Sequence, residues 1–75
     1  MSDRIIFTDH ALEKLRQRRI TKSLVLKTIK HCEKMVYEQG YYHVFRKWQH
    51  RYLKVIFKRE GEIIIVITEY FIYRL

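Results

Sequence analysis

Three basic side chains near the N-terminus recur at intervals of four residues: His10, Lys14 and Arg18. Residues four apart lie along one side of an α-helix, so these three would form a line beside the apolar stripe of Ala11 and Leu15. An imidazole exchanges a proton near neutral pH, and the two cations can bind a phosphate. The alternative is an amphipathic helix whose basic side chains only border the core.

The chemistry that these residue types suit is cleavage of RNA without a metal. The 2′-hydroxyl of RNA is a built-in nucleophile, so the reaction needs a base for that hydroxyl, an acid for the leaving oxygen and cations for the charge that develops on the phosphate. His10 is the candidate acid or base. The candidates for holding the scissile phosphate, or for supporting the residues that do, are Lys14, Arg18, Arg51, Lys54 and Tyr70.

A second group of basic residues, in the middle of the chain, is interleaved with aromatic residues. Cations bind phosphates and exposed rings stack on bases, a combination that is typical of surfaces for single-stranded nucleic acid. Aromatic residues in strands more often belong to the core, and several of these rings must do so. The residues from which we expect RNA contacts are Arg46, Lys47, Trp48, Tyr52, Lys54 and Lys58.

The sequence contains none of the common motifs for nucleotide binding, hydrolase catalysis or metal binding. It has no Gly-rich phosphate loop, no dinucleotide fingerprint and no Gly-x-Ser-x-Gly elbow. His31, His43 and His50 lack metal-ligand spacing. The single Cys32 can form neither an internal disulfide nor a cysteine-based zinc site. We therefore expect neither a metal nor a cofactor.

Length and charge indicate the class of protein. A chain of 75 residues, 48% of them hydrophobic, normally forms one small domain, here residues 1–75. The formal net charge of +8 favours a polyanionic partner; the alternative is a solvated basic surface with no specific partner. The longest apolar run, Ile63–Thr68, is too short to cross a membrane, and Met1–Arg4 does not resemble the start of a signal peptide. We expect a cytoplasmic protein with no membrane partner.

Apolar residues at helical spacing predict two helices early in the chain, after a short β-prone segment at residues 5–7. The first should run to about Arg18, and the second has a stripe that extends to Cys32. Only a few residues separate the two, which favours a helical hairpin. The capping residues are Thr8 or Asp9 for the first helix and Thr21 or Ser23 for the second.

Beyond residue 33 the apolar period changes to that of strands. Turns are predicted at Gln39-Gly40 and at Glu60-Gly61. The last strand is nearly continuous in Ile and Val, which is typical of a strand covered on both faces. The predicted fold is α+β with the order β-α-α-β-β-β-β, in which both helices pack on one face of a mainly antiparallel sheet. The predicted strands in this part are residues 34–38, 41–48, 51–59 and 62–70.

Two short motifs, one near each end of the chain, match the pattern of a known family. Within Phe7–Thr21, His10 is followed by Ala, by a basic residue four positions on, by an Arg four further and then by Ile-Thr. Near the C-terminus a predicted strand runs into Val66-Ile67-Thr68-Glu69-Tyr70. Together these motifs resemble domain-of-unknown-function family 4258 over nearly the whole chain. That family is similar in length and element order to RelE-like and BrnT-like toxins of toxin–antitoxin pairs.

The resemblance implies a RelE/barnase-like fold and cleavage of mRNA, free or bound to the ribosome, without a metal. It also implies a cognate antitoxin protein that neutralises the activity. Lys14 stands where the family usually has Arg, which keeps the charge but loses the bidentate fork. Arg19 stands where Gly is usual, at a helix end that favours a left-handed residue. The positions that match the family motifs are His10, Lys14, Arg18, Thr68 and Tyr70.

Three functional hypotheses follow. The first is a small RNA endonuclease that acts as a toxin. The second is a non-enzymatic RNA- or ribosome-binding module on the same fold, whose binding would depend steeply on salt. The third is a protein-interaction or oligomerisation unit, in which the hydrophobic C-terminal segment Tyr70–Leu75 would add to the sheet edge of a partner.

Overall fold

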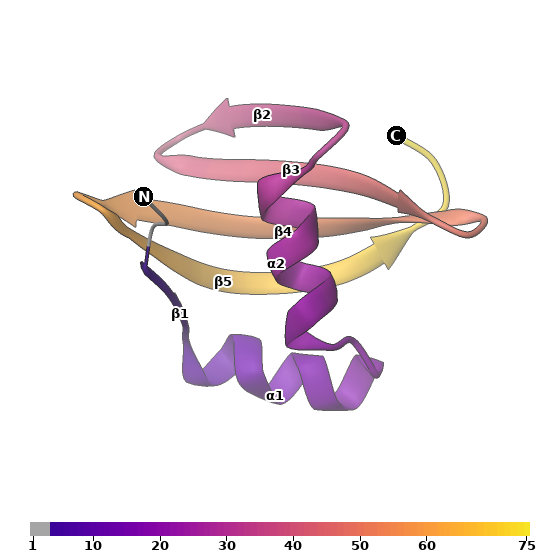
Figure 1. Cartoon of the computed structure of the whole chain (residues 1–75), viewed down its shortest axis with the longest axis horizontal. Coiled ribbons are helices and arrows are strands. Elements are labelled where there is room, and N and C mark those ends of the chain that lie inside the picture. The colour runs from indigo at the N-terminus through magenta and orange to yellow at the C-terminus, as the bar shows by residue number, and fades with distance from the viewer. Residues whose placement is uncertain (1–3) are drawn as a thin grey trace.

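Seven elements follow one another along residues 4–75, the part of the chain that the computed structural model describes (Figure 1). Their order, β-α-α-β-β-β-β, is the predicted one. Residues 1–3, which belong to the predicted domain and to the predicted N-terminal segment, lie outside the described residues. The elements are β1 (Arg4–Phe7), α1 (Asp9–Arg18), α2 (Lys22–Lys30), β2 (Lys34–Glu38), β3 (Tyr41–Trp48), β4 (Arg51–Glu60) and β5 (Ile63–Ile72).

Helix α1 begins and ends at residues that the sequence singles out. The Oγ1 of Thr8 accepts a hydrogen bond from the Ala11 main-chain N–H at 3.0 Å, and it donates to the Ile67 carbonyl at 3.3 Å. This hydroxyl therefore caps α1 and also joins the helix to β5. Arg19 ends α1 in the left-handed region, with φ 55° and ψ 45°. The turn that the family resemblance associates with glycine thus forms with an arginine, at a cost of roughly 1 kcal/mol.

Helix α2 is capped by Thr21, whose Oγ1 accepts a hydrogen bond from the Leu24 N–H at 3.1 Å. It ends at Lys30, two residues before the predicted end of its apolar stripe. The reason is visible at His31, whose carbonyl accepts a hydrogen bond from Arg46 Nη1 of β3 at 2.8 Å instead of continuing the helix. Cys32 follows the helix and still packs against the core.

The strands form one sheet in the order β1-β5-β4-β3-β2. β1 runs parallel to β5, and the other neighbours are antiparallel, as predicted. The turn between β4 and β5 lies at Gly61-Glu62, one residue later than expected, because β4 continues to Glu60. β5 continues to Ile72, so Tyr70, Phe71 and Ile72 of the proposed interacting tail belong to the sheet.

Both helices pack on one face of the sheet, as predicted. Figure 1 shows α2 crossing this face over β3 and β4, while α1 lies along β5 beyond the end of the short β1. None of the helices in the described part of the chain is long and apolar enough to span a membrane. The core between helices and sheet consists of Ala11, Leu15, Ile20, Val25, Val44, Leu53, Val55, Phe57, Ile64 and Val66.

The other face of the sheet, which we call the open face, is covered by no element within residues 4–75. The prediction that the last strand is covered on both faces is therefore wrong. Ile64 and Val66 of β5 are buried under the helices, whereas Ile63 and Ile65 point to the open face and are half-buried. Their shelter comes from neighbouring side chains within the sheet, not from a second layer.

A β-bulge between β4 and β5 decides which side chains of β5 face the helices. Phe57 pairs with Val66, and the next residue back, Ile56, pairs with Thr68, so Ile67 has no partner in the ladder. An extra residue reverses the alternation of side chains beyond it. Glu69 therefore points under the helices and Tyr70 points to the open face, the opposite of what the alternation from Ile64 and Val66 predicts.

Candidate nucleic-acid interface

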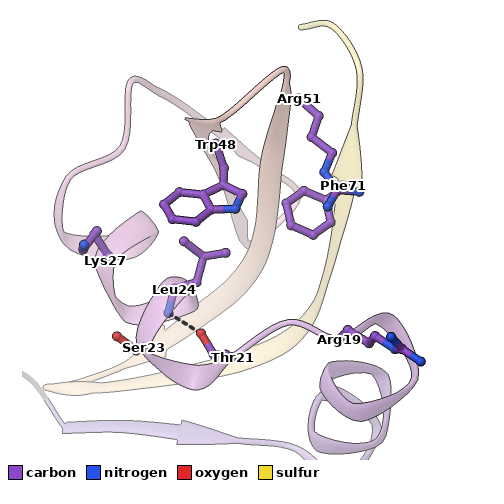
Figure 2. A pocket seen from close by; sticks show the side chains of 8 residues that line it. All are labelled: Arg19, Thr21, Ser23, Leu24, Lys27, Trp48, Arg51 and Phe71. Carbon is purple, nitrogen blue, oxygen red and sulfur yellow. Dashed lines mark hydrogen bonds between the residues drawn. The ribbon is translucent and has the colours of Figure 1, made fainter.

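A pocket of about 300 Å³ opens between the α1–α2 turn, α2 and the ends of β3, β4 and β5. Figure 2 shows Trp48 and Phe71 entering it from the sheet, with Lys27 and Arg19 on opposite sides. Three of the residues that line it are cations and none is an acid. We call it the basic pocket. Its lining residues are Arg19, Thr21, Ser23, Leu24, Lys27, Trp48, Arg51 and Phe71.

Arg51 is the most constrained cation of the basic pocket. It is the first residue of β4, and its guanidinium carbon lies 3.8 Å from the centre of the Phe71 ring on the neighbouring strand (Figure 2). Its Nε is buried and has no hydrogen-bond partner among the described residues. The aromatic ring fixes the plane of the guanidinium, and its terminal N–H groups make no hydrogen bond within residues 4–75. These terminal groups, not the buried Nε, are suited to bind an anion.

Trp48 supplies an aromatic surface next to this cation. The β3–β4 hairpin pairs Trp48 directly with Arg51, and its turn includes Gln49 in the left-handed region, with φ 61°. The indole remains 41% exposed. An exposed ring beside a cation can stack on a base while the cation binds the adjoining phosphate.

A row of alternating cations and rings crosses the open face at right angles to the strands. Lys34, Phe45, Lys54 and Tyr70 are successive register partners on β2, β3, β4 and β5. Lys34 Nζ lies 6.0 Å from the Phe45 ring centre, and Lys54 Nζ lies 5.5 Å from both the Phe45 and the Tyr70 centres. Arg18 of α1 completes the row, with its guanidinium carbon 5.6 Å from the Tyr70 centre. We call this the cation–aromatic row.

Arg18 reaches this row around the uncovered edge of β5. Its Nη1 donates a hydrogen bond of 2.7 Å to the main-chain carbonyl of Glu69, 51 residues away in the sequence. β1 is short and pairs only with Ile63–Val66, so among the described residues no strand lies beside the later part of β5 on this side. The arginine occupies part of the position that a longer β1 would fill.

Glu69 is the residue of this region that the sequence did not single out. Its side chain is fully buried, and neither carboxylate oxygen has a hydrogen-bond partner within residues 4–75. Burial raises the pKa of this carboxyl from its ordinary value of 4.5 to about 7, although the positive charge of Arg18 lowers it. Along β5 the next side chain on the same face is Phe71 of the basic pocket. A buried acid of this kind is more frequent at functional sites than elsewhere.

The predicted catalytic residues do not gather in one site. Arg18 and Tyr70 meet in the cation–aromatic row, where Lys54 of β4 also approaches the Tyr70 ring. Arg51 instead lines the basic pocket, on the face of the sheet that the helices cover. His10 is exposed at the start of α1, and its side chain makes no hydrogen bond with any residue from 4 to 75. Their catalytic roles stay predictions.

Lys14 is engaged along its own helix. Its Nζ donates to Gln17 Oε1 at 3.1 Å, and Gln17 Nε2 donates in turn to Glu13 Oε2 at 3.0 Å. The line of three basic residues that the spacing predicts is therefore present on α1, but its middle member has local partners. A phosphate would have to replace these contacts to bind Lys14.

The predicted RNA-binding residues are divided between the two faces of the sheet. Arg46 and Trp48 point to the helices, and Arg46 already holds the end of α2 through His31. Lys47 and Tyr52 are register partners on the open face. The others there are Lys54, in the cation–aromatic row, and Lys58, which forms an ion pair of 3.5 Å with Glu60. Alternating basic residues along two strands cannot all meet one ligand, because successive side chains face opposite sides.

The described residues form no candidate metal-binding site. No three side chains of His, Cys, Asp or Glu within residues 4–75 lie close enough together to hold a metal ion. The groups available for chemistry in both places are cations, rings and hydroxyls.

Comparisons with known proteins identify a family without an assigned activity. A family described as a domain of unknown function, DUF4258, matches residues 7–71. Neither the curated proteins nor the solved structures contain a match to the chain. The resemblance of the two sequence motifs to this family is thus confirmed, and the similarity to RelE-like toxins stays a prediction.

Proposed function

Because the chain belongs to DUF4258, whose description assigns no function, we propose its function from the geometry: it binds single-stranded RNA through the basic pocket. The observation that carries the proposal is the composition of that pocket. It combines three cations, no acid and two aromatic rings in about 300 Å³. Cations for phosphates and rings for bases are what a single strand requires.

Each part of a nucleotide finds a suitable group in the basic pocket. Arg51 is held in place by Phe71 and makes no hydrogen bond within residues 4–75, so its terminal N–H groups are the ones that bind the phosphate. Trp48 stacks on the base. The hydroxyl of Ser23, at the margin of the pocket, suits the 2′-hydroxyl that distinguishes RNA from DNA. The net charge of +8 adds attraction that depends on salt but not on sequence.

Replacing Arg51 with methionine should weaken RNA binding about tenfold. The substitution removes the positive charge and the N–H donors of the guanidinium that stacks on Phe71. The slope of log affinity against log salt should fall by about 0.7, the loss of one phosphate contact on a single strand. Fluorescence anisotropy with a labelled oligoribonucleotide in excess EDTA measures both quantities.

The matched control is Arg4→Met. Arg4 is exposed on β1 next to Ile63, at the end of the sheet opposite to Arg51, so the same net charge is lost far from the basic pocket. We expect a change of less than about threefold for this variant. Equal losses from the two substitutions would contradict the pocket and would leave only non-specific attraction by net charge.

Cleavage of the bound RNA without a metal is the second candidate function. The observation that favours it is the meeting of Arg18 and Lys54 at the Tyr70 ring, since two cations and a phenol from three elements suit a developing phosphorane charge. His10 lies at the other end of α1, eight residues from Arg18, so the scissile phosphate would have to lie between the two for the imidazole to transfer the proton. A toxin role in the cytoplasm, with mRNA as substrate and a cognate antitoxin as partner, depends on this activity.

In excess EDTA, the wild type should convert end-labelled single-stranded RNA to products that end in a 2′,3′-cyclic phosphate, and His10→Ala should yield none. The exposed position of His10 means that this variant should fold normally, which circular dichroism checks. Retention of intact RNA by both proteins would contradict cleavage of free RNA and support binding alone.

A further inference from the structure

Strand β2 is an edge strand with few features that protect it against pairing with another chain. Within residues 4–75 its only neighbour in the sheet is β3, and Figure 1 shows no element beyond it. All of its residues are exposed, and the three in the middle are apolar: Met35 is 58%, Val36 37% and Tyr37 63% exposed. Natural edge strands are protected by short length, charged side chains, a proline or a bulge. β2 has no proline, its register with β3 is continuous, and its charges lie only at its two ends, Lys34 and Glu38.

The sequence of β2 is complementary to itself in the antiparallel direction. When two copies pair about Val36, Lys34 of one copy faces Glu38 of the other at both ends. Met35 of one copy then faces Tyr37 of the other. Opposite residues of an antiparallel pair have Cβ atoms about 5 Å apart, close enough for the charges and for the sulfur–ring contact to be favourable. We infer that two copies of this chain form a dimer through β2, which joins their sheets into one.

In the single chain, the side chains of β2 already lie on the faces of the sheet that this pairing requires. Lys34 and Glu38 lie on the same face of the sheet, as residues four apart in a strand must. Tyr37 is held on the opposite face by the ring of Tyr42, 4.7 Å away centre to centre. A shift of the pairing by two residues would leave both charges of each copy without an opposite charge. The charges therefore select the register centred on Val36.

The dimer has one two-fold axis, which passes between the two Val36 residues and is perpendicular to the sheet. Both open faces lie on the same side of the joined sheet. The cation–aromatic rows of the two copies then approach each other through Lys34, the residue of the row on β2. The inference does not depend on RNA binding, because it is carried by β2 alone.

Charge reversal tests the inference directly. In sedimentation equilibrium the wild-type chain should behave as a concentration-dependent dimer. Lys34→Glu alone and Glu38→Lys alone place like charges opposite each other at both ends of the pairing, and each should weaken the dimer at least about tenfold. An equimolar mixture of the two variants should restore it, because every end pair in the mixed dimer again joins opposite charges.

Three further measurements make the result specific. The double variant Lys34→Glu/Glu38→Lys should dimerise with itself like the wild type. Lys30→Glu, on the exposed end of α2, makes the same charge change as Lys34→Glu and should leave the dimer intact. Native mass spectrometry with one variant isotope-labelled identifies the mixed dimer. A wild type that stays monomeric up to its solubility limit, or folded single variants that fail to recover on mixing, would overturn the inference.

Discussion

Replacing Glu69 with methionine should raise the free energy of unfolding at pH 8 by roughly 3 kcal/mol, with a much smaller gain at pH 5. The carboxyl is fully buried and has no hydrogen-bond partner among the described residues, so its ionised form is expensive in the folded protein. Methionine has a similar length, fills the same space and has no charge to bury. For a domain of this size the gain is a large fraction of the total stability.

The pH dependence follows from the direction in which burial moves the pKa. The folded protein holds the Glu69 proton up to about pH 7, whereas the unfolded chain releases it near 4.5. Between these values the folded state binds more protons than the unfolded state. The free energy of unfolding of the wild type should therefore fall as the pH rises from about 4.5 to about 7, and stay level above that.

Denaturant unfolding of the wild type and of Glu69→Met, followed by circular dichroism between pH 4 and 8, measures this effect. The difference between the two curves cancels the titration of the histidines and other groups that both proteins share. Glu69→Gln is the conservative control. It should also lose the slope between pH 4.5 and 7, but it gains less stability because a buried amide still lacks partners. If both variants keep the slope of the wild type, Glu69 does not titrate in this range.

The elements of the fold could be predicted because local signals agree with one another. Thr8 and Thr21 are side-chain caps directly before apolar residues at helical spacing, and both perform that role. Gln39-Gly40 lies between two segments of strand period and forms the β2–β3 turn. The helix and strand ends that differ from the prediction depend on distant partners. At the end of α2, Arg46 of β3 binds the carbonyl of His31, the residue after the helix.

The candidate site could be predicted only in part, because it depends on which face of the sheet each side chain reaches. The alternation of side chains along a strand predicts that Lys54 lies on the face opposite to Leu53 and Val55 of β4, and this prediction is confirmed. It fails beyond Ile67, because the bulge there reverses the phase of β5. Glu69 was missed for this reason. The one signal in the sequence was an acid within a run of apolar residues.

The basic pocket illustrates a second limit of the sequence. Arg51 and Phe71 belong to strands that become neighbours only when β4 and β5 pair, and their stacking depends on the register of that pair. Arg51 and Trp48 were both predicted for RNA, but as parts of different groups. The structure brings them together at the end of one hairpin. The residues were identifiable by type, while their arrangement followed from tertiary pairing.

Replacing Arg18 with methionine should lower the free energy of unfolding at pH 8 by roughly 1.5 kcal/mol, the low end for a charged hydrogen bond, because solvent screens the exposed guanidinium. Its Nη1 donates to the Glu69 carbonyl at 2.7 Å, and its charge lowers the pKa of the Glu69 carboxyl. The loss should be smaller at pH 5, where that carboxyl is neutral. It should also become independent of pH in the Glu69→Met background. Chemical denaturation of the four proteins of this double-mutant cycle measures both effects.

Arg16→Met is the matched control, because Arg16 is exposed in the same last turn of α1 and its guanidinium makes no hydrogen bond or ion pair within residues 4–75. We expect it to change stability by less than about 0.5 kcal/mol. The same variants separate the two roles of Arg18. If Arg18→Met lowers stability but leaves RNA affinity unchanged where the protein is folded, Arg18 only closes the edge of β5. If RNA affinity also falls while Arg16→Met has no effect, the cation–aromatic row extends the RNA surface from the basic pocket to the open face.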